Sequence, residues 1–299
     1  MRVMVTGGSG NIGQEVTRLL HELHHEVFVY DLVPSPDPLA TFLEGDIRDA
    51  AHVARAFKDV RAEGIVHLAG TLQFACDIDP AGAAGVNVTG TVNVLEAAVQ
   101  SGARRIVFSS SAAVYGATDA VVRESSPIQA NVSSYGAGKL LAERMLRRYQ
   151  ARHGLICRSV RFSTVLSSRP VSSPGVAAAV CALLGAASRA EVTVKGVAGP
   201  ELRHFIHVAD AARGAVLALL IDRCEDDLFN IAGGDDSYLS FDDLVAIIKR
   251  IHPGFGKVIF VGVSGNRGRI DCSKATDQLG YRPEYGIEMA IREVMKNVN

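Results

Sequence analysis

The first 31 residues constrain the fold more than any other segment. An apolar run at Arg2–Thr6 predicts a strand, a helical pattern covers Asn11–Leu23, and Glu26–Asp31 predicts a second strand. Between the first strand and the helix lies the glycine-rich segment Gly7–Gly13. A strand that leads through a glycine loop into a helix and then to another strand typically begins a parallel sheet wound with helices.

The alternation continues through the first half of the chain. Further strands are predicted at Thr41–Glu44, Gly64–Ala69, Arg104–Ser110 and Leu155–Phe162, and further helices at Ala50–Val60, Pro80–Ser101 and Ser134–His153. The strands are continuous apolar runs, as expected when helices cover both faces of a sheet. We therefore predict an α/β fold built on a doubly wound parallel sheet.

The pattern changes after Phe162. Ser163–Gly175 is rich in serine and proline without periodicity, which predicts a loop or a crossing between domains. Beyond it we expect helices at Val176–Ala187, Ala209–Ile221, Ser240–Ile251 and Ile287–Val298, with short strands at Val192–Lys195 and Phe205–Val208. Ser240 is the expected N-cap of its helix.

Composition argues against several classes of function. The 31 Lys+Arg and 32 Asp+Glu give a net charge of −1, which provides no basic field for nucleic acid or an anionic membrane. The five cysteines include no C-x-x-C pair, so we expect reduced thiols in a cytoplasmic protein and no metal site. The apolar run Val176–Ala187 is shorter than the roughly 20 residues that cross a bilayer. We expect a small-molecule substrate.

The glycine loop predicts dinucleotide binding. Gly8, Gly10 and Gly13 fit the spacing G-x-G-x-x-G, and Gly7, Gly10 and Gly13 fit a wider one. Bare backbone here lets N–H groups and the helix N-terminus approach a pyrophosphate, while Gly13 lets the helix pack closely on the strand.

Acidic and small residues at the ends of later strands support this prediction. Asp31 follows Gly13 by 18 residues, near the spacing at which a carboxylate accepts hydrogen bonds from the adenosine ribose. A carboxylate would repel a 2′-phosphate, so NAD is favoured over NADP. Gly45–Ile47 and His67–Gly70 also follow strands, at the sheet edge where such folds bind ligands.

A second motif indicates acid–base chemistry. Tyr135 and Lys139 lie four residues apart at the start of a predicted helix, and therefore on one face. A nearby ammonium lowers the pKa of a phenol toward the range of a general base. The serines Ser109–Ser111 end a predicted strand and could donate a hydrogen bond to the same substrate oxygen.

These motifs together resemble the extended short-chain dehydrogenase/reductase family, in its NAD-dependent epimerase/dehydratase branch. The resemblance rests on Thr6–Gly13, Asp31, Gly45–Ile47, His67–Ala69, Asn87–Thr91, Phe108–Gly116 and Tyr135-x-x-x-Lys139, and it continues in Arg203–Asp210, Phe229–Ile231, Asp271–Ala275 and Leu279–Pro283. It implies a Rossmann-type NAD-binding domain over residues 1–165, to which 204–232 returns. Residues 166–203 and 233–299 would form a smaller C-terminal α/β substrate domain.

The resemblance also implies roles for individual residues. NAD contacts are expected from Gly7, Gly10, Asn11, Ile12, Gly13, Asp31, Asp46, Ile47, Leu68, Ala69, Gly70, Asn87, Ser109, Tyr135 and Lys139. Ser111 would be the catalytic hydroxyl, Tyr135 the base, and Lys139 the group that binds the nicotinamide ribose and lowers the tyrosine pKa. Ser111, Tyr135, Ser163, Arg203 and Arg269 would contact the substrate, the arginines at its diphosphate.

The expected activity is epimerisation of a nucleotide sugar, at C4 of a UDP-hexose, by a homodimer. Ser163 replaces the asparagine usual in this branch, Gly196–Pro200 replaces its usual Gly-Asp-Gly segment, and the stretch between Lys257 and Asp271 is short. These departures lie on the substrate side and motivate an alternative, an NAD-dependent dehydrogenase of a smaller sugar acid or alcohol. A third hypothesis is a non-catalytic NAD-binding scaffold, in which the Ser/Tyr/Lys set is idle.

Overall fold

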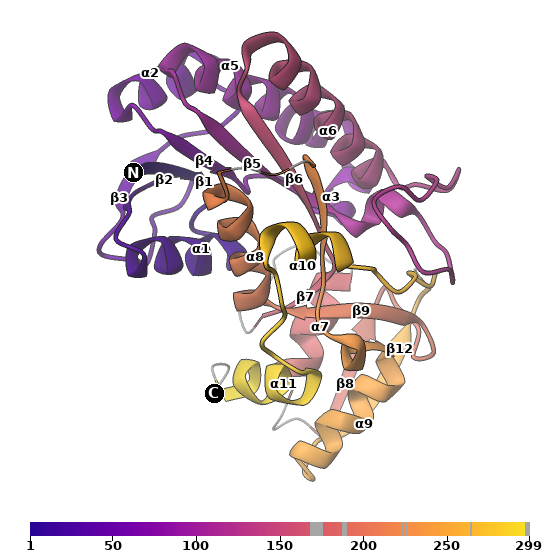
Figure 1. Cartoon of the computed structure of the whole chain (residues 1–299). Helices are drawn as coiled ribbons and strands as arrows, with labels where there is room; N and C mark the ends of the chain where they lie inside the picture. The colour runs from indigo at the N-terminus through magenta and orange to yellow at the C-terminus, as the bar shows by residue number, and fades with distance from the viewer. Residues whose placement is uncertain (168–175, 187–189, 223, 225, 264, 297–299) are drawn as a thin grey trace.

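A seven-stranded parallel sheet organises the chain (Figure 1). The computed structural model describes residues 1–167, 176–186, 190–222, 224, 226–263 and 265–296. In pairing order the strands are β10 (Leu228–Ile231), β6 (Ile156–Phe162), β5 (Arg105–Ser111), β4 (Gly64–His67), β1 (Arg2–Thr6), β2 (Glu26–Asp31) and β3 (Thr41–Glu44). Every pair in this sheet is parallel, which confirms the predicted α/β class.

Helices cover both faces of the sheet (Figure 1). One face carries α2 (Ala50–Val60), α5 (Thr91–Ser101) and α6 (Ser134–His153), and the other carries α1 (Asn11–Glu22) and α8 (Val208–Leu220). Successive strand residues point to opposite faces. Ile65 and Ile106 accordingly pack with the first group of helices, whereas Val66 and Val107 pack with the second. Both faces are therefore core, as the continuous apolar strands predicted.

The predicted helix Pro80–Ser101 is interrupted by a π-helical turn. The structure has α4 (Pro80–Ala84), the π turn η1 (Gly85–Gly90) and then α5, and a short helix α3 (Gln73–Ile78) that was not predicted comes before them. At Gly90 an added Cβ would lie 2.6 Å from the side chain of Ile47, so this close contact requires glycine. Such π turns often occur at functional sites.

The C-terminal part contains two small sheets. One pairs β7 (Thr164–Leu166), β9 (Leu202–His207) and β11 (Tyr238–Ser240), and the other pairs β8 (Glu191–Lys195) with β12 (Lys257–Val261). Around them lie α7 (Val176–Leu184), α9 (Phe241–Ile251), α10 (Ser273–Leu279), α11 (Ile287–Lys296) and the short turns η2 (Ala112–Tyr115) and η3 (Asp235–Ser237). A separate cluster of buried apolar side chains fills this part.

Some sequence predictions for this part differ from the structure. Thr164–Leu166 is a strand inside the predicted loop, because it pairs with β9. Strands β10, β11 and β12 and helix α10 were not predicted. The predicted helices that end at Ala187 and Val298 extend into residues outside those described, as does the loop prediction at 168–175. Ser240 is confirmed as an N-cap, since it forms a reciprocal capping box with Asp243.

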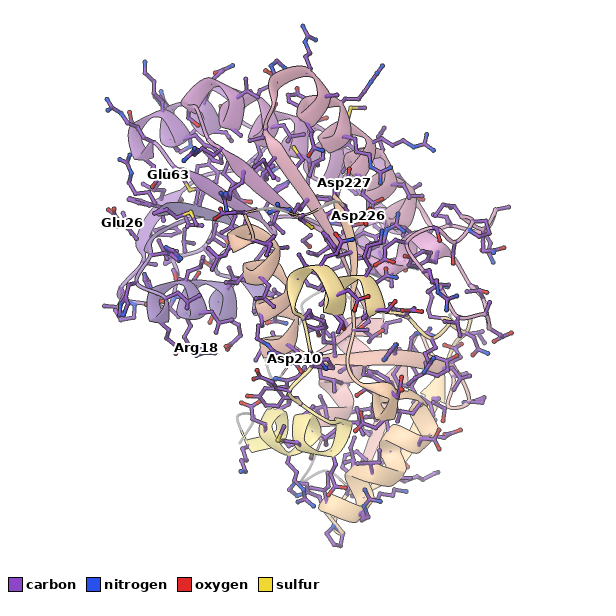
Figure 2. The ribbon with its side chains drawn as sticks, viewed as in Figure 1. Arg18, Glu26, Glu63, Asp210, Asp226 and Asp227 are labelled. Carbon is purple, nitrogen blue, oxygen red and sulfur yellow. The ribbon has the colours of Figure 1, made fainter. Side chains whose placement is uncertain are left out.

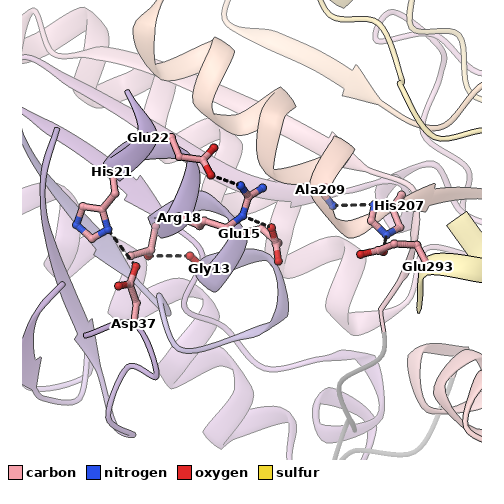
Figure 3. A network of polar contacts seen from close by, with 10 residues as sticks. Gly13, Glu15, Arg18, His21, Glu22, Asp37, His207, Ala209 and Glu293 are labelled. Carbon is pink, nitrogen blue, oxygen red and sulfur yellow. Dashed lines mark hydrogen bonds and ion pairs between the residues drawn. The ribbon is translucent and has the colours of Figure 1, made fainter. Parts of the chain in front are cut away.

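Two buried polar groups join the C-terminal segment to α8. Asp210, labelled in Figure 2, accepts hydrogen bonds from the backbone N–H groups of Glu284 and Tyr285. His207 accepts the N–H of Ala209 through Nδ1 and donates through Nε2 to Glu293 of α11 (Figure 3). These bonds hold α11 against the helix that packs on the main sheet.

No helix in the described ranges is long and apolar enough to span a membrane. None of the five cysteines forms a disulfide, and Cys76 and Cys157 are buried.

Candidate functional site

The glycine loop lies at the carboxyl end of β1, where the order of the sheet reverses between β1 and β4. Gly7 has a φ of +72°, and an added Cβ would lie 2.5 Å from the amide nitrogen of Ala69. At Gly13 an added Cβ would lie 2.3 Å from the carbonyl oxygen of Gly7. These two glycines are therefore required by the packing of the loop itself.

Gly10 is different, because a Cβ there would meet only the Gly7 oxygen, at 3.3 Å. Gly10 is the N-cap of α1, no side chain caps the helix, and its first turn contains no acidic residue. Asn11 and Ile12 follow as partly exposed residues. The loop thus presents bare backbone and an uncapped helix N-terminus, a cradle that fits a pyrophosphate.

Asp31 ends β2 beside this loop. Its Oδ2 accepts the backbone N–H of Ser9 at 3.0 Å, and its Oδ1 accepts that of Leu32 at 2.7 Å. Oδ1 also accepts the N–H of Val33 at 3.3 Å, whereas Oδ2 keeps a lone pair for a further donor, such as a ribose hydroxyl. The two residues that follow, Leu32 and Val33, are exposed and apolar, so neither provides a basic side chain for a 2′-phosphate.

Asp46 and Ile47 follow β3. Arg48 donates to the Asp46 carboxylate through its backbone N–H at 2.8 Å and through Nε at 2.9 Å. The same guanidinium holds the pKa of Asp46 below its ordinary value. Ile47 is buried against Gly90, and its carbonyl accepts a hydrogen bond from Asn93 at 2.9 Å.

The segment after β4 converges with the π turn and with α6. Leu68 is bonded through its N–H to the carbonyl of Thr6 at 2.9 Å, and Ala69 packs against Gly7. An added Cβ at Gly70 would lie 2.9 Å from Asn87 Oδ1 and 3.5 Å from Lys139 Nζ. The structure therefore brings the predicted cofactor residues Gly70, Asn87 and Lys139 together.

Ser111, Tyr135 and Lys139 form one cluster at the carboxyl end of β5. The Lys139 ammonium donates to the carbonyl of Ser109 at 2.7 Å, and it lies 5.7 Å from the centre of the Tyr135 ring. The hydroxyl of Ser111 is hydrogen-bonded to Tyr135. Tyr135 is partly exposed, whereas Lys139 is buried, so the phenol is the member of the pair that a substrate can reach.

The pKa shifts in this cluster differ from the sequence expectation. Desolvation raises the pKa of Tyr135 to about 12, and the Ser111 hydrogen bond opposes the rise. Desolvation lowers the pKa of Lys139 to about 8. The ammonium is directed to the Ser109 carbonyl rather than to the phenol oxygen, so in the protein alone Lys139 does not produce the expected lowering of the tyrosine pKa.

The residues expected to bind substrate are in three different situations. Ser163 is buried, and among the described residues its hydroxyl has no hydrogen-bond partner. Arg203 is 2% exposed, and its guanidinium donates to the carbonyls of Leu202 and Gly265 and to Glu201. Arg269 is 42% exposed and pairs with Asp235 at 2.6 Å. The structure thus places Arg203 in the interior rather than at an open surface.

Several polar residues near these positions were missed by the sequence analysis. Arg267 is partly buried, desolvation lowers its pKa, and its side chain makes no hydrogen bond to another described residue. Its position two residues before Arg269 was the available signal. Ser110, Glu143 and Arg161 form a buried chain next to the cluster of Ser111, Tyr135 and Lys139. Glu143 follows Lys139 by four residues, which could have placed it on the same helical face.

No group of three or more His, Cys, Asp or Glu side chains in the described part of the chain is arranged to hold a metal ion.

Comparison with known proteins places this geometry among enzymes. The sequence pattern of the "NAD dependent epimerase/dehydratase family" matches residues 3–232. A UDP-glucose 4-epimerase from Azospirillum brasilense is 34% identical over 243 residues, covering 73% of this chain and 68% of that protein.

Among solved structures, a UDP-glucose 4-epimerase from Thermotoga maritima with UDP-glucose has a TM-score of 0.87 at 27% identity, covering 100% of both chains. An L-threonine dehydrogenase from Phytophthora infestans has a TM-score of 0.89 at 22% identity, covering 100% of this chain and 99% of that one, and shows the fold alone.

Proposed function

Because the chain belongs to the NAD-dependent epimerase/dehydratase family and is an NAD-dependent enzyme of that type, we propose that it epimerises a nucleotide sugar, inverting C4 of a UDP-hexose. The observation that carries the proposal is the Ser111–Tyr135–Lys139 cluster beside Gly70, at the edge of the sheet that also holds the glycine loop. The similarity of the chain to UDP-glucose 4-epimerases supports the choice of substrate.

The residues of the cluster have complementary roles in this reaction. When bound, NAD supplies the acceptor for the hydride of the reacting carbon. Tyr135, as the phenolate, takes the proton of the sugar 4-hydroxyl, and Ser111 donates a hydrogen bond to the same oxygen. The 4-keto sugar would then turn over in the site, so that C4 presents its other face when it is reduced, and Tyr135 would return the proton to the 4-oxygen. Lys139 does not lower the tyrosine pKa in the protein alone, and its proposed role is to favour the phenolate through its positive charge once NAD and substrate are bound.

The substrate phosphates would meet Arg267 and Arg269 rather than Arg203. The guanidinium of Arg203 is already held by Glu201 and two carbonyls. The Arg267 side chain makes no hydrogen bond to another described residue, and the charge of Glu201 acts on it. A guanidinium with open donors is suited to bidentate binding of phosphate.

Alanine substitutions separate these two roles. Arg203→Ala is expected to destabilise the fold, by roughly 3–5 kcal/mol, because it breaks a buried ion pair by removing the guanidinium that donates to the Glu201 carboxylate. Arg267→Ala should leave the melting temperature nearly unchanged but raise the KM for the nucleotide sugar about tenfold or more. Melting curves and KM values of both variants check the assignment; a folded Arg203→Ala protein with a raised KM alone would reverse it.

Asp31 is proposed to select NAD. Asp31→Ala is expected to weaken NAD binding about tenfold or more, because a charged hydrogen-bond acceptor is lost, and to narrow the preference for NAD over NADP. Calorimetric titration of cofactor-free protein with both dinucleotides measures this. Asp37→Ala is the matched control, since Asp37 bonds His21 at 3.0 Å (Figure 3). Equal NAD affinity in wild type and Asp31→Ala would refute the role.

A second candidate is an NAD-dependent dehydrogenase of a smaller sugar acid or alcohol. The observation that favours it is the substrate side of the site, where Arg203 is occupied by Glu201 and Ser163 stands in place of an amide side chain. Such an enzyme releases NADH, so NADH absorbance should rise in proportion to a free sugar acid or alcohol. An epimerase gives no such rise.

A thermal-shift panel discriminates the two candidates. UDP-, GDP- and TDP-sugars are added to the protein with NAD present, and a ligand at about 100 times its Kd should stabilise the fold by roughly 2.7 kcal/mol. The epimerase proposal expects a shift with UDP-hexoses. A shift with free sugar acids and none with any nucleotide sugar would favour the dehydrogenase.

We also propose that the chain forms the homodimer that the resemblance implies, and that two copies pair through α5 and α6. A surface cavity of about 520 Å³ lies between these helices, at the end of α6 away from Tyr135, and is lined by Glu96, Arg148, Tyr149, Ala151, Arg152 and His153. Light scattering should give twice the 31.7 kDa chain mass.

A further inference from the structure

Three consecutive serines at the end of β5 are each bonded to a different residue of α6. The Ser109 carbonyl accepts the Lys139 ammonium at 2.7 Å, the Ser110 hydroxyl donates to Glu143 Oε1 at 2.5 Å, and the Ser111 hydroxyl is bonded to Tyr135. Tyr135, Lys139 and Glu143 are spaced four residues apart and share one face of the helix. The strand and the helix are thus joined at three successive points.

Glu143 is the one member of this face with a charged partner on the next strand. Arg161 of β6 donates to Glu143 through Nε at 2.9 Å and through Nη2 at 2.7 Å, and the two side chains are only 4% and 7% exposed. Arg161 pairs in register with Ser110 of β5, so the Glu143 carboxylate accepts hydrogen bonds from two residues that lie side by side on adjacent strands.

Further contacts hold the side chain of Arg161. Its guanidinium lies 4.8 Å from the centre of the Tyr115 ring, and the Tyr115 hydroxyl donates to Asn230 of β10 at 2.6 Å. The chain of contacts therefore runs from α6 across β5 and β6 to the edge strand of the sheet. A buried pair with this geometry has few alternative arrangements, because an unpaired charge in the interior is costly.

We propose that Glu143, held by Ser110 and Arg161, is a positioning residue that sets the place and charge of Lys139 and the register of Tyr135 against Ser111. The carboxylate lies one helical turn from the ammonium and favours its charged form. The inference rests on the proposed catalytic roles of Tyr135 and Lys139.

The test uses Glu143→Gln, which keeps the shape and one acceptor but removes the charge. Lysine labelled with ¹³C at Cε gives one NMR signal for each of the seven lysines, and Lys139→Met identifies the signal of Lys139. The pKa of Lys139 is about 8 in the wild type. Loss of the Glu143 charge should move the midpoint of its titration to lower pH, by roughly half a pH unit or more.

The other titratable groups around Lys139 are unchanged in the Glu143→Gln variant. They are Tyr135 on the same helix, Cys76 of α3 and His67 of β4. The NMR titration needs no substrate, so its result stands whether or not UDP-hexoses turn over. An unchanged Lys139 midpoint in folded Glu143→Gln would overturn the proposal.

Kinetics provide the second readout. In Glu143→Gln, kcat should fall about 10- to 100-fold and the pH profile should shift, while the KM for substrate stays within about threefold, because misplacement of reacting groups acts on the chemical step. Asp227→Asn is the matched control. Asp227, labelled in Figure 2, precedes β10 and forms an ion pair at 3.0 Å with Arg147, an exposed residue of α6.

Ser110→Ala tests the positioning role of Glu143 if Glu143→Gln does not fold. It removes one hydroxyl and leaves the ion pair intact. We expect a wild-type melting temperature, a kcat reduced by roughly tenfold and a shifted pH profile. Wild-type kcat and pH profile in Ser110→Ala would overturn the role of this chain of contacts.

Discussion

Tyr135→Phe is expected to lower kcat by about two to four orders of magnitude and to leave the protein folded with NAD bound. The substitution removes only the hydroxyl that would take the substrate proton. In the structure that hydroxyl is bonded to Ser111, so the fold loses a single contact. Rates under single-turnover conditions, with the bound cofactor quantified after denaturation, measure both parts of the result.

Tyr149→Phe is the matched control for this prediction. Tyr149 lies on the same helix, and its hydroxyl donates to Glu96 of α5, away from the catalytic cluster. The control should retain wild-type kcat. If Tyr135→Phe kept more than about a tenth of wild-type kcat, the tyrosine would not be the base, and the proposed acid–base chemistry would be wrong.

The second large effect is expected in the glycine loop, where substitution of either of two glycines should weaken NAD binding but only one substitution should destabilise the fold. Gly13→Ala forces a methyl group to within 2.3 Å of the Gly7 carbonyl and 2.6 Å of the Gly8 Cα. Because both neighbours are backbone atoms, the loop must shift. We expect the free energy of unfolding to fall by about 1–3 kcal/mol and NAD binding to be lost as well.

Gly10→Ala should preserve the fold and remove the ligand. The added methyl group meets only the Gly7 oxygen, at 3.3 Å, so the melting temperature of the cofactor-free protein should change little. It occupies the space through which the pyrophosphate approaches the backbone, so NAD affinity should fall about 100-fold or more. Melting curves and NAD titrations of both variants test this contrast. Full NAD affinity in Gly10→Ala would place the pyrophosphate elsewhere.

Most of the nucleotide-binding half could be predicted from the sequence because its signals are local. The bounds of β1, β2, β3, α2 and α6 are those expected from apolar runs and helical periodicity. Gly7 and Gly13 identify the loop because the close backbone contacts there admit no side chain. Positions that require glycine can be recognised in the sequence because they recur at a fixed spacing.

The substrate side was less predictable because its polar contacts join residues far apart in the chain. Arg203 has the position of a phosphate-binding arginine in the family pattern, yet Glu201 and the Gly265 carbonyl hold it in the interior. The strands β7 and β10 are short and are defined by their partners, not by their own periodicity. The π turn at Gly85–Gly90 ends at a glycine that packs against Ile47, a contact between distant residues that local sequence does not reveal.

The Glu143–Arg161 pair illustrates the same limit. Each residue alone is an ordinary charged side chain in the sequence. Only the adjacent positions of β5, β6 and α6 show that both are buried and bonded to each other.

The proposal that the chain is a UDP-hexose 4-epimerase is tested most directly by NMR of the reaction itself. Purified protein that retains its NAD is incubated separately with UDP-glucose and with UDP-galactose, and the sugar signals are followed without added cofactor. The account predicts that both reactions reach the same mixture of the two sugars and that NADH does not accumulate. No interconversion by folded, NAD-containing protein, or stoichiometric NADH with an oxidised product, would contradict it.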